Sequence, residues 1–185
     1  MKTKSILLLL LLGICSINTQ NVIAQNRAKS TFFSFGVGAG ILALETNEKT
    51  RFSVAPSLAY KGGYMISEKT AVILLIQGAA YKNWDNDKTR GVGGLTLGAQ
   101  HWIYNKWWAL GGLGVGLETP PMLAKNETWN LGFPALNLST GYEIWRNGKY
   151  SVDIQSVFLL GRSKIYKSSG TGNIYFSGVS IAVNM

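Results

Sequence analysis

The stretch from Thr31 to Met185 is a series of short β-type segments whose connections carry Tyr and Trp at their edges. The pattern predicts strands near 31–43, 51–63, 70–82, 91–104, 107–118, 131–145, 149–162 and 173–185. Each is about ten residues or a little longer, the length that a tilted strand needs to cross the hydrocarbon layer of a bilayer. The even count is typical of antiparallel membrane barrels. The sequence therefore predicts an all-β fold, an eight-stranded antiparallel up-and-down transmembrane β-barrel.

The connections alternate in length, and this alternation predicts an orientation. Long polar loops at 44–50, 83–90, 119–130 and 163–172 alternate with short turns at 64–69, 104–107 and 146–148. Bacterial barrels place their short turns in the periplasm and their long loops outside the cell. Both termini are therefore expected on the periplasmic side.

Aromatic residues at the strand ends indicate two membrane interfaces. Indole and phenol rings have an apolar body and a polar tip, so they collect where hydrocarbon meets lipid headgroups. The predicted interface aromatics are Tyr64, Tyr81, Trp84, Trp102, Tyr104, Trp107, Trp108, Trp129, Trp145 and Tyr150. The alternative is that these rings form the core of a soluble sandwich.

The amino terminus predicts export. Lys2 and Lys4 precede the apolar run 6–14, and the small residue Ala24 provides a secretory cleavage site. The expected organisation is a signal peptide at 1–24, a short N-terminal segment at 25–30 and the barrel domain at 31–185. The single cysteine, Cys15, lies in the leader, so the mature chain is expected to have no disulfide and no thiol chemistry.

Alternation within the strands indicates which side chains face lipid. In the sixth strand the even-numbered residues of 135–144 are predicted to face outward, and in the last strand the odd-numbered residues of 175–183. In the seventh strand Val157 and Leu159 break the alternation, which predicts a β-bulge there. The third strand is apolar on both faces over 71–76 and has no predicted orientation.

The same parity predicts a polar cluster in the lumen. A carboxylate inside a narrow barrel is costly unless it is paired, so inward acids should meet a cation and amides. The candidate cluster is Lys61, Glu143, Asp153, Gln155 and Gln100. Its expected role is to fill and fix the lumen, because an eight-stranded barrel is only wide enough for its own side chains.

Charge suggests a partner for one loop. The chain has a formal net charge of +9, and Arg162, Lys164 and Lys167 gather without an acidic residue nearby. On the outside of the cell such a loop could pair with phosphates of lipopolysaccharide. The alternative is a solvated loop without a ligand. Nucleic acid is excluded as a partner, because the aromatic residues mark the rims and do not line a continuous basic face.

Catalysis is not expected. The only histidine, His101, faces lipid by parity and has no serine beside it in the sequence. Only a serine from a neighbouring strand could complete a triad. The 22 glycines lie mostly inside strands, where no helix follows to bind a phosphate. The expected protein is not an enzyme and uses no cofactor or metal.

The leader, the eight segments and a second strand reading Val54-Ala55-Pro56-Ser57-Leu58-Ala59-Tyr60 together resemble a known family. They are similar to the small outer-membrane β-barrel proteins of Gram-negative bacteria, especially those of the Bacteroidota, with an architecture of the OmpA/OmpX type. The resemblance covers 31–185 and departs at the end, where Met185 replaces the usual aromatic residue.

The resemblance implies an outer-membrane location, with outer-membrane lipid and lipopolysaccharide as partners. It also implies contact with periplasmic chaperones and the barrel assembly machinery during biogenesis. The expected function is structural or surface-binding. A narrow solute channel, a soluble lipocalin-like binder of apolar ligands and, less favoured, an enzyme acting on membrane lipid are the alternatives.

Overall fold

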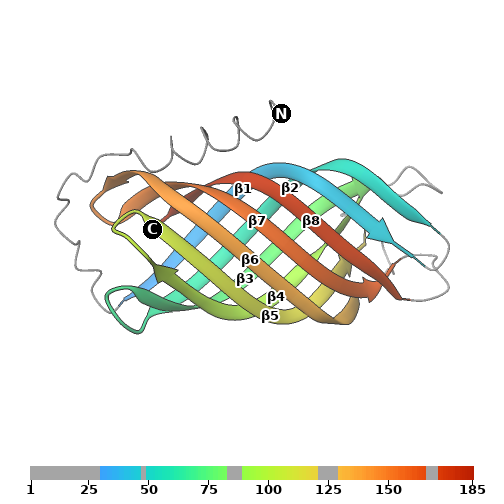
Figure 1. Ribbon diagram of the computed structural model, residues 1–185, viewed down its shortest axis with the longest axis horizontal. Coiled ribbons are helices and arrows are strands. Elements are labelled where there is room, and N and C mark those ends of the chain that lie inside the picture. Colours follow the sequence, from blue (N-terminus) through green and yellow to red (C-terminus); the bar gives the residue numbers. More distant parts are fainter. Residues whose placement is uncertain (1–29, 47–48, 83–88, 121–128, 166–170) are drawn as a thin grey trace, which may run out of the picture.

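The computed structural model describes residues 30–46, 49–82, 89–120, 129–165 and 171–185 (Figure 1). Within these ranges the regular elements are strands. They are β1 (Thr31–Glu45), β2 (Thr50–Met65), β3 (Thr70–Lys82), β4 (Thr89–Trp102), β5 (Trp107–Thr119), β6 (Asn130–Asn147), β7 (Tyr150–Lys164) and β8 (Thr171–Asn184). No helix in the described part of the chain is long and apolar enough to cross a bilayer.

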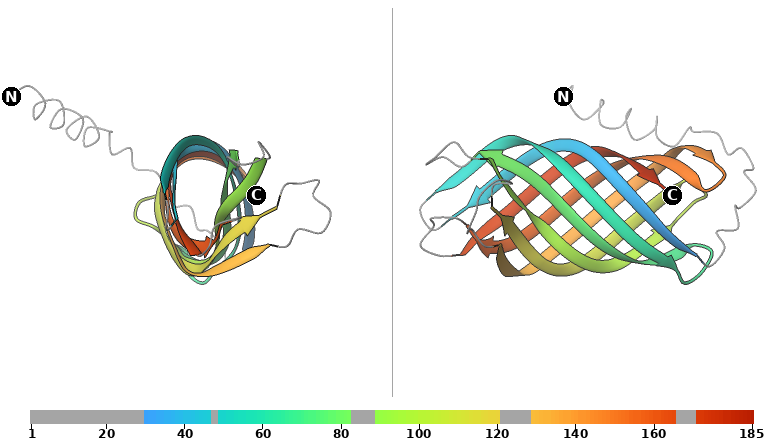
Figure 2. Two further views of the ribbon diagram at one scale, coloured as in Figure 1. Left: turned by 90° about the vertical axis from the view of Figure 1, so that its right-hand side faces the viewer. Right: turned by 180° about the vertical axis from the view of Figure 1, so that it is seen from behind.

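The strands form one closed barrel in sequence order. Each strand pairs antiparallel with the next, and β8 returns to pair with β1, so the sheet has no free edge. The view along the axis in Figure 2 shows the resulting ring. The predicted eight-stranded antiparallel barrel is confirmed, and closure satisfies the backbone hydrogen bonds that lipid cannot satisfy.

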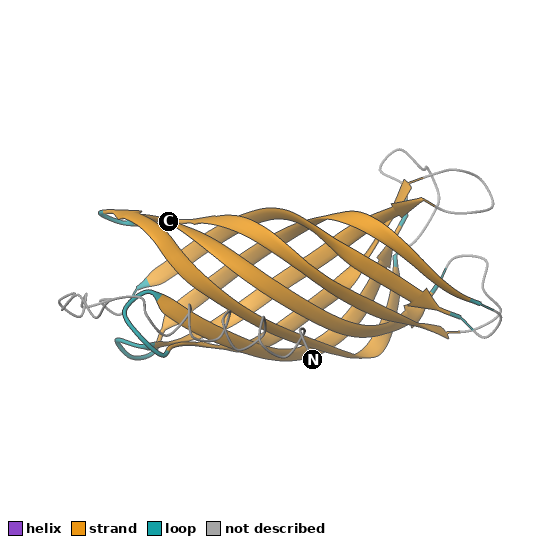
Figure 3. Ribbon diagram, turned by 45° about the horizontal axis from the view of Figure 1, so that its top comes forward, coloured by secondary structure: helices purple, strands orange, loops and turns teal. Residues whose placement is uncertain are grey.

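The two ends of the barrel differ. Short turns at 66–69, 103–106 and 148–149 lie at one end together with Ser30 and Met185, and we call it the turn end (Figure 3). Gly148 in the last of these turns has a φ of 57°, a left-handed conformation that favours glycine. The longer connections leave from the opposite end, which we call the loop end.

Side chains alternate between the two faces of the barrel wall. The predicted parities of the sixth and last strands are confirmed. The structure also assigns the faces of β3, which the sequence left open: Ile73 and Leu75 point inward, and Leu74 points to the outside. Val157 and Leu159 also point inward, and the register of β7 with β8 runs without a break.

The expected bulge in β7 is therefore wrong. The alternation never breaks there: the inner face simply changes from polar to apolar along the strand. Irregular pairing lies instead in β6, once between Glu143 and Trp145 and once opposite Gly114 and Gly116, beside the cis bond from Phe133 to Pro134.

The outer face is apolar over most of the barrel height. Val54 is 83% exposed, and Leu97, Leu113 and Val179 are exposed in the same way on other strands. A soluble monomer rarely exposes a contiguous apolar surface of this extent. The outward faces therefore fit a lipid environment and disfavour the soluble lipocalin-like alternative.

The interior is filled by side chains in two apolar clusters. Near the loop end Leu42, Leu44, Leu159 and Phe176 are buried against one another. Nearer the turn end a second cluster is built around Trp102 and Trp108, with apolar residues of β2, β3 and β5. The barrel wall thus surrounds a packed core at two levels.

The interface aromatics need a correction. Tyr81, Trp102 and Trp108 point into the barrel, and Trp108 is only 1% exposed. The reason is strand parity: adjacent residues face opposite sides, so only one of Trp107 and Trp108 can reach lipid. The remaining described members are exposed at the outer surface, namely Tyr64, Tyr104, Trp107, Trp129, Trp145 and Tyr150. Trp84 lies outside the described residues.

Candidate functional site

The structure places all five residues of the predicted lumen cluster on the inner face, where each is buried. Lys61 donates from Nζ to Oε1 of Gln100 at 3.3 Å. The same ammonium lies 4.1 Å from the centroid of the Trp108 ring. A buried cation is thus stabilised by an amide oxygen and by the face of an indole.

The two acids of the cluster take different partners. Glu143 and Asp153 stand directly opposite each other in the β6–β7 register. Asp153 accepts from Nε1 of Trp108 at 2.8 Å. Glu143 accepts from Nε of Arg146 at 2.9 Å, because the irregular pairing after Glu143 turns Arg146 toward the lumen. The sequence did not predict Arg146 as a member of the cluster, because the irregular pairing after Glu143 changes which face Arg146 points to. It did not predict Trp108 as a member either, because Trp108 was assigned to the membrane interface.

A second polar network near the loop end was not predicted. Glu118 is 0% exposed and accepts from Tyr81 Oη at 2.9 Å and from Arg90 Nε at 2.7 Å through Oε1. Its Oε2 accepts from Asn130 Nδ2 at 2.7 Å and from an Arg90 terminal nitrogen at 3.3 Å. The sequence hides this site, because Arg90 and Asn130 were assigned to loops and Tyr81 to the membrane interface.

The partners of Glu118 flank two long connections. Tyr81 and Arg90 stand before and after the β3–β4 connection, while Glu118 and Asn130 stand before and after the β5–β6 connection. The Glu118 carboxylate therefore links the strand ends on either side of the β3–β4 connection to those on either side of the β5–β6 connection. Glu45 acts similarly on the outer surface, where its Oε2 accepts from the Asn173 amide and the Tyr175 hydroxyl, both at 3.0 Å.

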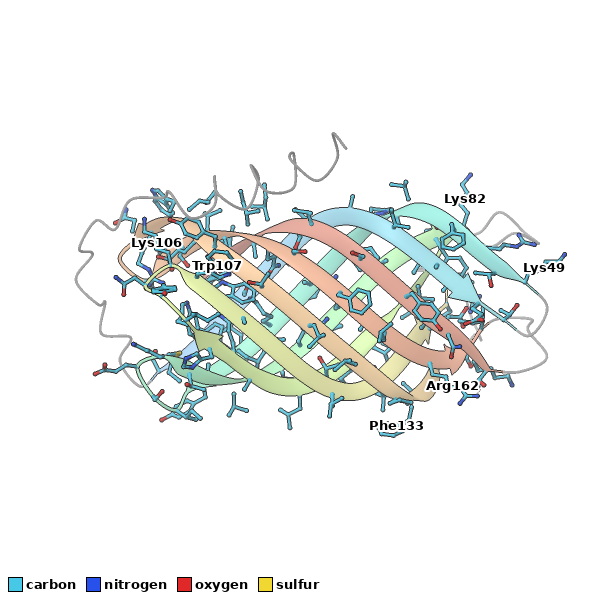
Figure 4. The ribbon with its side chains drawn as sticks, viewed as in Figure 1. Lys49, Lys82, Lys106, Trp107, Phe133 and Arg162 are labelled. Carbon is cyan, nitrogen blue, oxygen red and sulfur yellow. The ribbon has the colours of Figure 1, made fainter. Side chains whose placement is uncertain are left out.

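Basic side chains extend from the loop end. Arg162 and Lys164 of the predicted basic loop lie in β7 and are exposed, whereas Lys167 lies outside the described residues. Arg162 donates from Nε to Oγ1 of Thr171 at 3.2 Å. Figure 4 shows Lys49, Lys82 and Arg162 at this end, with Lys106 and Trp107 at the turn end.

The start of β6 lies close to the backbone of Arg162 and carries an exposed aromatic residue. The backbone of Gly132 is so near to that of Arg162 that an added Cβ would lie 2.2 Å from the Arg162 carbonyl oxygen. The next residue, Phe133, is 73% exposed and points away from the barrel wall (Figure 4). The loop end of the outer surface therefore has an exposed guanidinium on β7 and an exposed apolar ring on the neighbouring strand β6.

His101 is exposed on the outer face near the turn end, as its parity predicts. The hydroxyl of Thr70 lies 3.0 Å from His101 Nδ1 across the β3–β4 pair. Among the described residues, no group of three or more His, Cys, Asp or Glu side chains could hold a metal ion.

Comparisons with solved structures match this geometry. No family model and no curated relative matches the chain. Ail, the attachment invasion locus protein of Yersinia pestis, is 12% identical with a TM-score of 0.52, and the alignment covers 83% of this chain and 99% of Ail. Neisserial surface protein A, NspA, is 15% identical with a TM-score of 0.52, over 85% of this chain and 99% of NspA.

The fold is that of the small outer-membrane β-barrels. At these identities the likeness concerns the fold, and it supports an outer-membrane location. The resemblance found in the sequence is confirmed at the level of the small outer-membrane barrel, while its Bacteroidota part stays a prediction.

Proposed function

We propose that this outer-membrane barrel has a structural and surface-binding role, without catalysis, and that Arg162 and Lys164 contact phosphates of lipopolysaccharide. The strands anchor the protein in the bilayer, and the loop end faces the outside of the cell. The proposal includes export through a signal peptide cleaved after Ala24, and membrane insertion by the barrel assembly machinery with periplasmic chaperones.

The observation that carries this proposal is the pair of exposed cations on β7, together with exposed Phe133 near the loop end of the neighbouring strand β6. Lipopolysaccharide carries phosphates directly above its acyl chains, so it suits a surface that has Arg162 and Lys164 at the rim and an exposed apolar ring, Phe133, on the next strand. Glu45 lies on the same outer row, since Arg162 pairs with Asn173 and Asn173 pairs with Glu45. Its carboxylate already accepts two hydrogen bonds, which reduces its competition for the two cations.

The filled lumen disfavours the solute channel. The apolar cluster of Leu42, Leu44, Leu159 and Phe176 and the ion pair of Arg90 with Glu118 occupy the loop half of the barrel. For the lumen to conduct a solute, both the apolar cluster and the Arg90–Glu118 ion pair would have to move aside. Planar bilayers containing the protein should therefore show no steady conductance.

The test compares binding of lipopolysaccharide by matched variants of the purified barrel in detergent. Replacing Arg162 and Lys164 with Gln should weaken binding, because two charged contacts to phosphates are lost. It should also reduce the salt dependence of binding, because fewer charged contacts remain for salt to screen. The control replaces Lys69 and Lys149, exposed lysines of the turn end, with Gln. Dephosphorylated lipopolysaccharide serves as the ligand control.

Sucrose octasulfate is a useful competitor in this assay, since Ail has been crystallised in complex with this heparin analogue. Equal binding by the wild type and the loop-end variant would contradict the proposal. Equal binding of phosphorylated and dephosphorylated lipopolysaccharide would contradict it as well.

A further inference from the structure

Polar side chains of three neighbouring strands form one row on the outer surface at the loop end. Arg162 of β7 pairs with Asn173 of β8, and Asn173 pairs with Glu45 of β1. By the two-residue alternation, each of the three residues belongs to the outward face of its strand. We call these three residues the loop-end row.

The loop-end row marks the border of the apolar outer band. On the same three strands, Ile41, Phe158 and Val179 lie nearer the turn end and are exposed on the outer face. Tyr175 is exposed one outward position closer to the turn end than Asn173, and tyrosines collect where hydrocarbon meets headgroups. In the proposed orientation, the row lies at the level at which the sugars and phosphates of lipopolysaccharide begin.

The Glu45 carboxylate is held in place by its neighbours. Oε2 accepts from Nδ2 of Asn173 and from Oη of Tyr175, both at 3.0 Å. Both bonds end on the same oxygen, which fixes the side chain and leaves Oε1 to accept from an outside donor. An ionised carboxylate only accepts hydrogen bonds, so a ligand group that binds here has an O–H or N–H, such as a sugar hydroxyl.

Arg162 supplies the opposite chemistry at the other end of the row. Its side chain is exposed, and Nε donates to Oγ1 of Thr171 at 3.2 Å (Figure 4). This bond uses Nε alone, so the two terminal nitrogens can form the forked pair of hydrogen bonds that binds a phosphate. Lys164 is exposed on the same face of β7 and adds a second positive charge.

The spacing of the row suits a ligand with two different ends. Adjacent strands are about 4.8 Å apart, so the backbones of Arg162 and Glu45, two strands apart, are separated by about 10 Å. The two side chains extend outward from these positions. A ligand that reaches both has a phosphate at one end and a hydrogen-bond donor at the other.

We infer that the loop-end row recognises a phosphorylated sugar of lipopolysaccharide. The phosphate binds Arg162, and a hydroxyl of the sugar donates to Oε1 of Glu45. This inference rests on the proposed function and adds the sugar to it. If the surface bound phosphate alone, Glu45 would only repel the ligand, whereas a sugar hydroxyl makes the same carboxylate a binding group.

The two roles of Glu45 predict opposite effects of Glu45→Ala, and two ligands separate them. Lipid A carries phosphorylated sugars, and short-chain phosphatidic acid carries a phosphate but no sugar. Each is titrated directly against the purified barrel in the same detergent. The matched control is Glu68→Ala, which removes an exposed carboxylate from the turn end.

Glu45→Ala should bind lipid A about fivefold more weakly than the wild type, because a charge-assisted hydrogen bond is lost. The same variant should bind phosphatidic acid up to about twofold more tightly, since a negative charge about 10 Å from the phosphate is removed. Unweakened binding of phosphatidic acid also shows that the variant is folded. Glu68→Ala should leave both affinities unchanged, because its charge lies at the far end of the barrel.

Tighter or unchanged binding of lipid A by Glu45→Ala would overturn the inference, and so would an equal loss in Glu68→Ala. A failure of the proposed function looks different. In that case the variant with Gln at both 162 and 164 would bind lipid A and phosphatidic acid as well as the wild type does. If that double variant loses affinity for both ligands while Glu45→Ala tightens both, the phosphate contact stands and the sugar contact is wrong.

Discussion

At the scale of single residues, Glu118 is a fully buried carboxylate that three side chains hold. It accepts from Tyr81, Arg90 and Asn130 inside the barrel. Glu118→Gln removes the negative charge from the buried ion pair of Arg90 with Glu118. Removing one partner of a buried pair typically costs about 3–5 kcal/mol. We therefore expect a large loss of unfolding free energy in urea titrations of the reconstituted barrel.

Glu45→Gln is the matched control, since Glu45 also accepts two hydrogen bonds but lies at the outer surface. Its effect should be much smaller. Equal effects of the two variants would show that the Glu118 network contributes no more than a surface carboxylate. The sequence could not reveal this network, because it depends on which loop-end residues still belong to strands and point inward.

Lys61 gives a second prediction at this scale. Lys61→Met keeps most of the side-chain volume but removes the ammonium that binds Gln100 and lies over Trp108. Loss of a charged hydrogen bond inside the barrel should cost about 1–3 kcal/mol. Thermal unfolding in detergent should begin at a lower temperature than in the wild type, and Lys69→Met at the exposed turn is the control. An unchanged transition would contradict a stabilising lumen cluster.

At the scale of strands, length and alternation were predictable, because a two-residue period and polar connections are local properties of a sequence. The β7 error arose because Val157 and Leu159 face a core that is apolar at that level. Along the barrel axis the lining of the lumen changes from polar near the turn end to apolar at the level of Leu159. This change depends on which strands surround the lumen at each level of the closed barrel. A pattern within one strand cannot show it.

Glycines on β4 and β5 give a prediction for a strand pair. An added Cβ on Gly98 would lie 2.1 Å from the carbonyl oxygen of Gly111, so the neighbouring backbone would have to move. An added Cβ on Gly111 would meet nothing closer than Leu138 at 3.8 Å. Gly98→Ala should therefore destabilise the barrel by about 1–3 kcal/mol, as overpacking does.

Gly111→Ala should be neutral or slightly stabilising, because alanine reduces the freedom of the unfolded chain. Both variants are compared by urea unfolding in the same lipid vesicles. If Gly111→Ala proved as damaging as Gly98→Ala, close approach of the strands would not be the reason for glycine at residue 98.

At the scale of the whole molecule, the two ends of the barrel face different compartments if the loop end lies outside the cell. The only cysteine of the chain is Cys15, in the predicted leader, so an introduced cysteine would be the sole thiol of the mature protein. Lys49 and Lys69 are exposed at the loop end and the turn end, respectively. The same change, lysine to cysteine, can therefore be made at either end of the barrel.

In intact cells, Lys49→Cys should react with a membrane-impermeant maleimide and Lys69→Cys should not. After the outer membrane is permeabilised, both variants should react, which shows that each thiol is accessible in the folded barrel. Slower gel migration after boiling checks that each variant is folded. Labelling of Lys69→Cys alone in intact cells would reverse the orientation, and it would place the Arg162 surface in the periplasm, away from lipopolysaccharide on the cell surface.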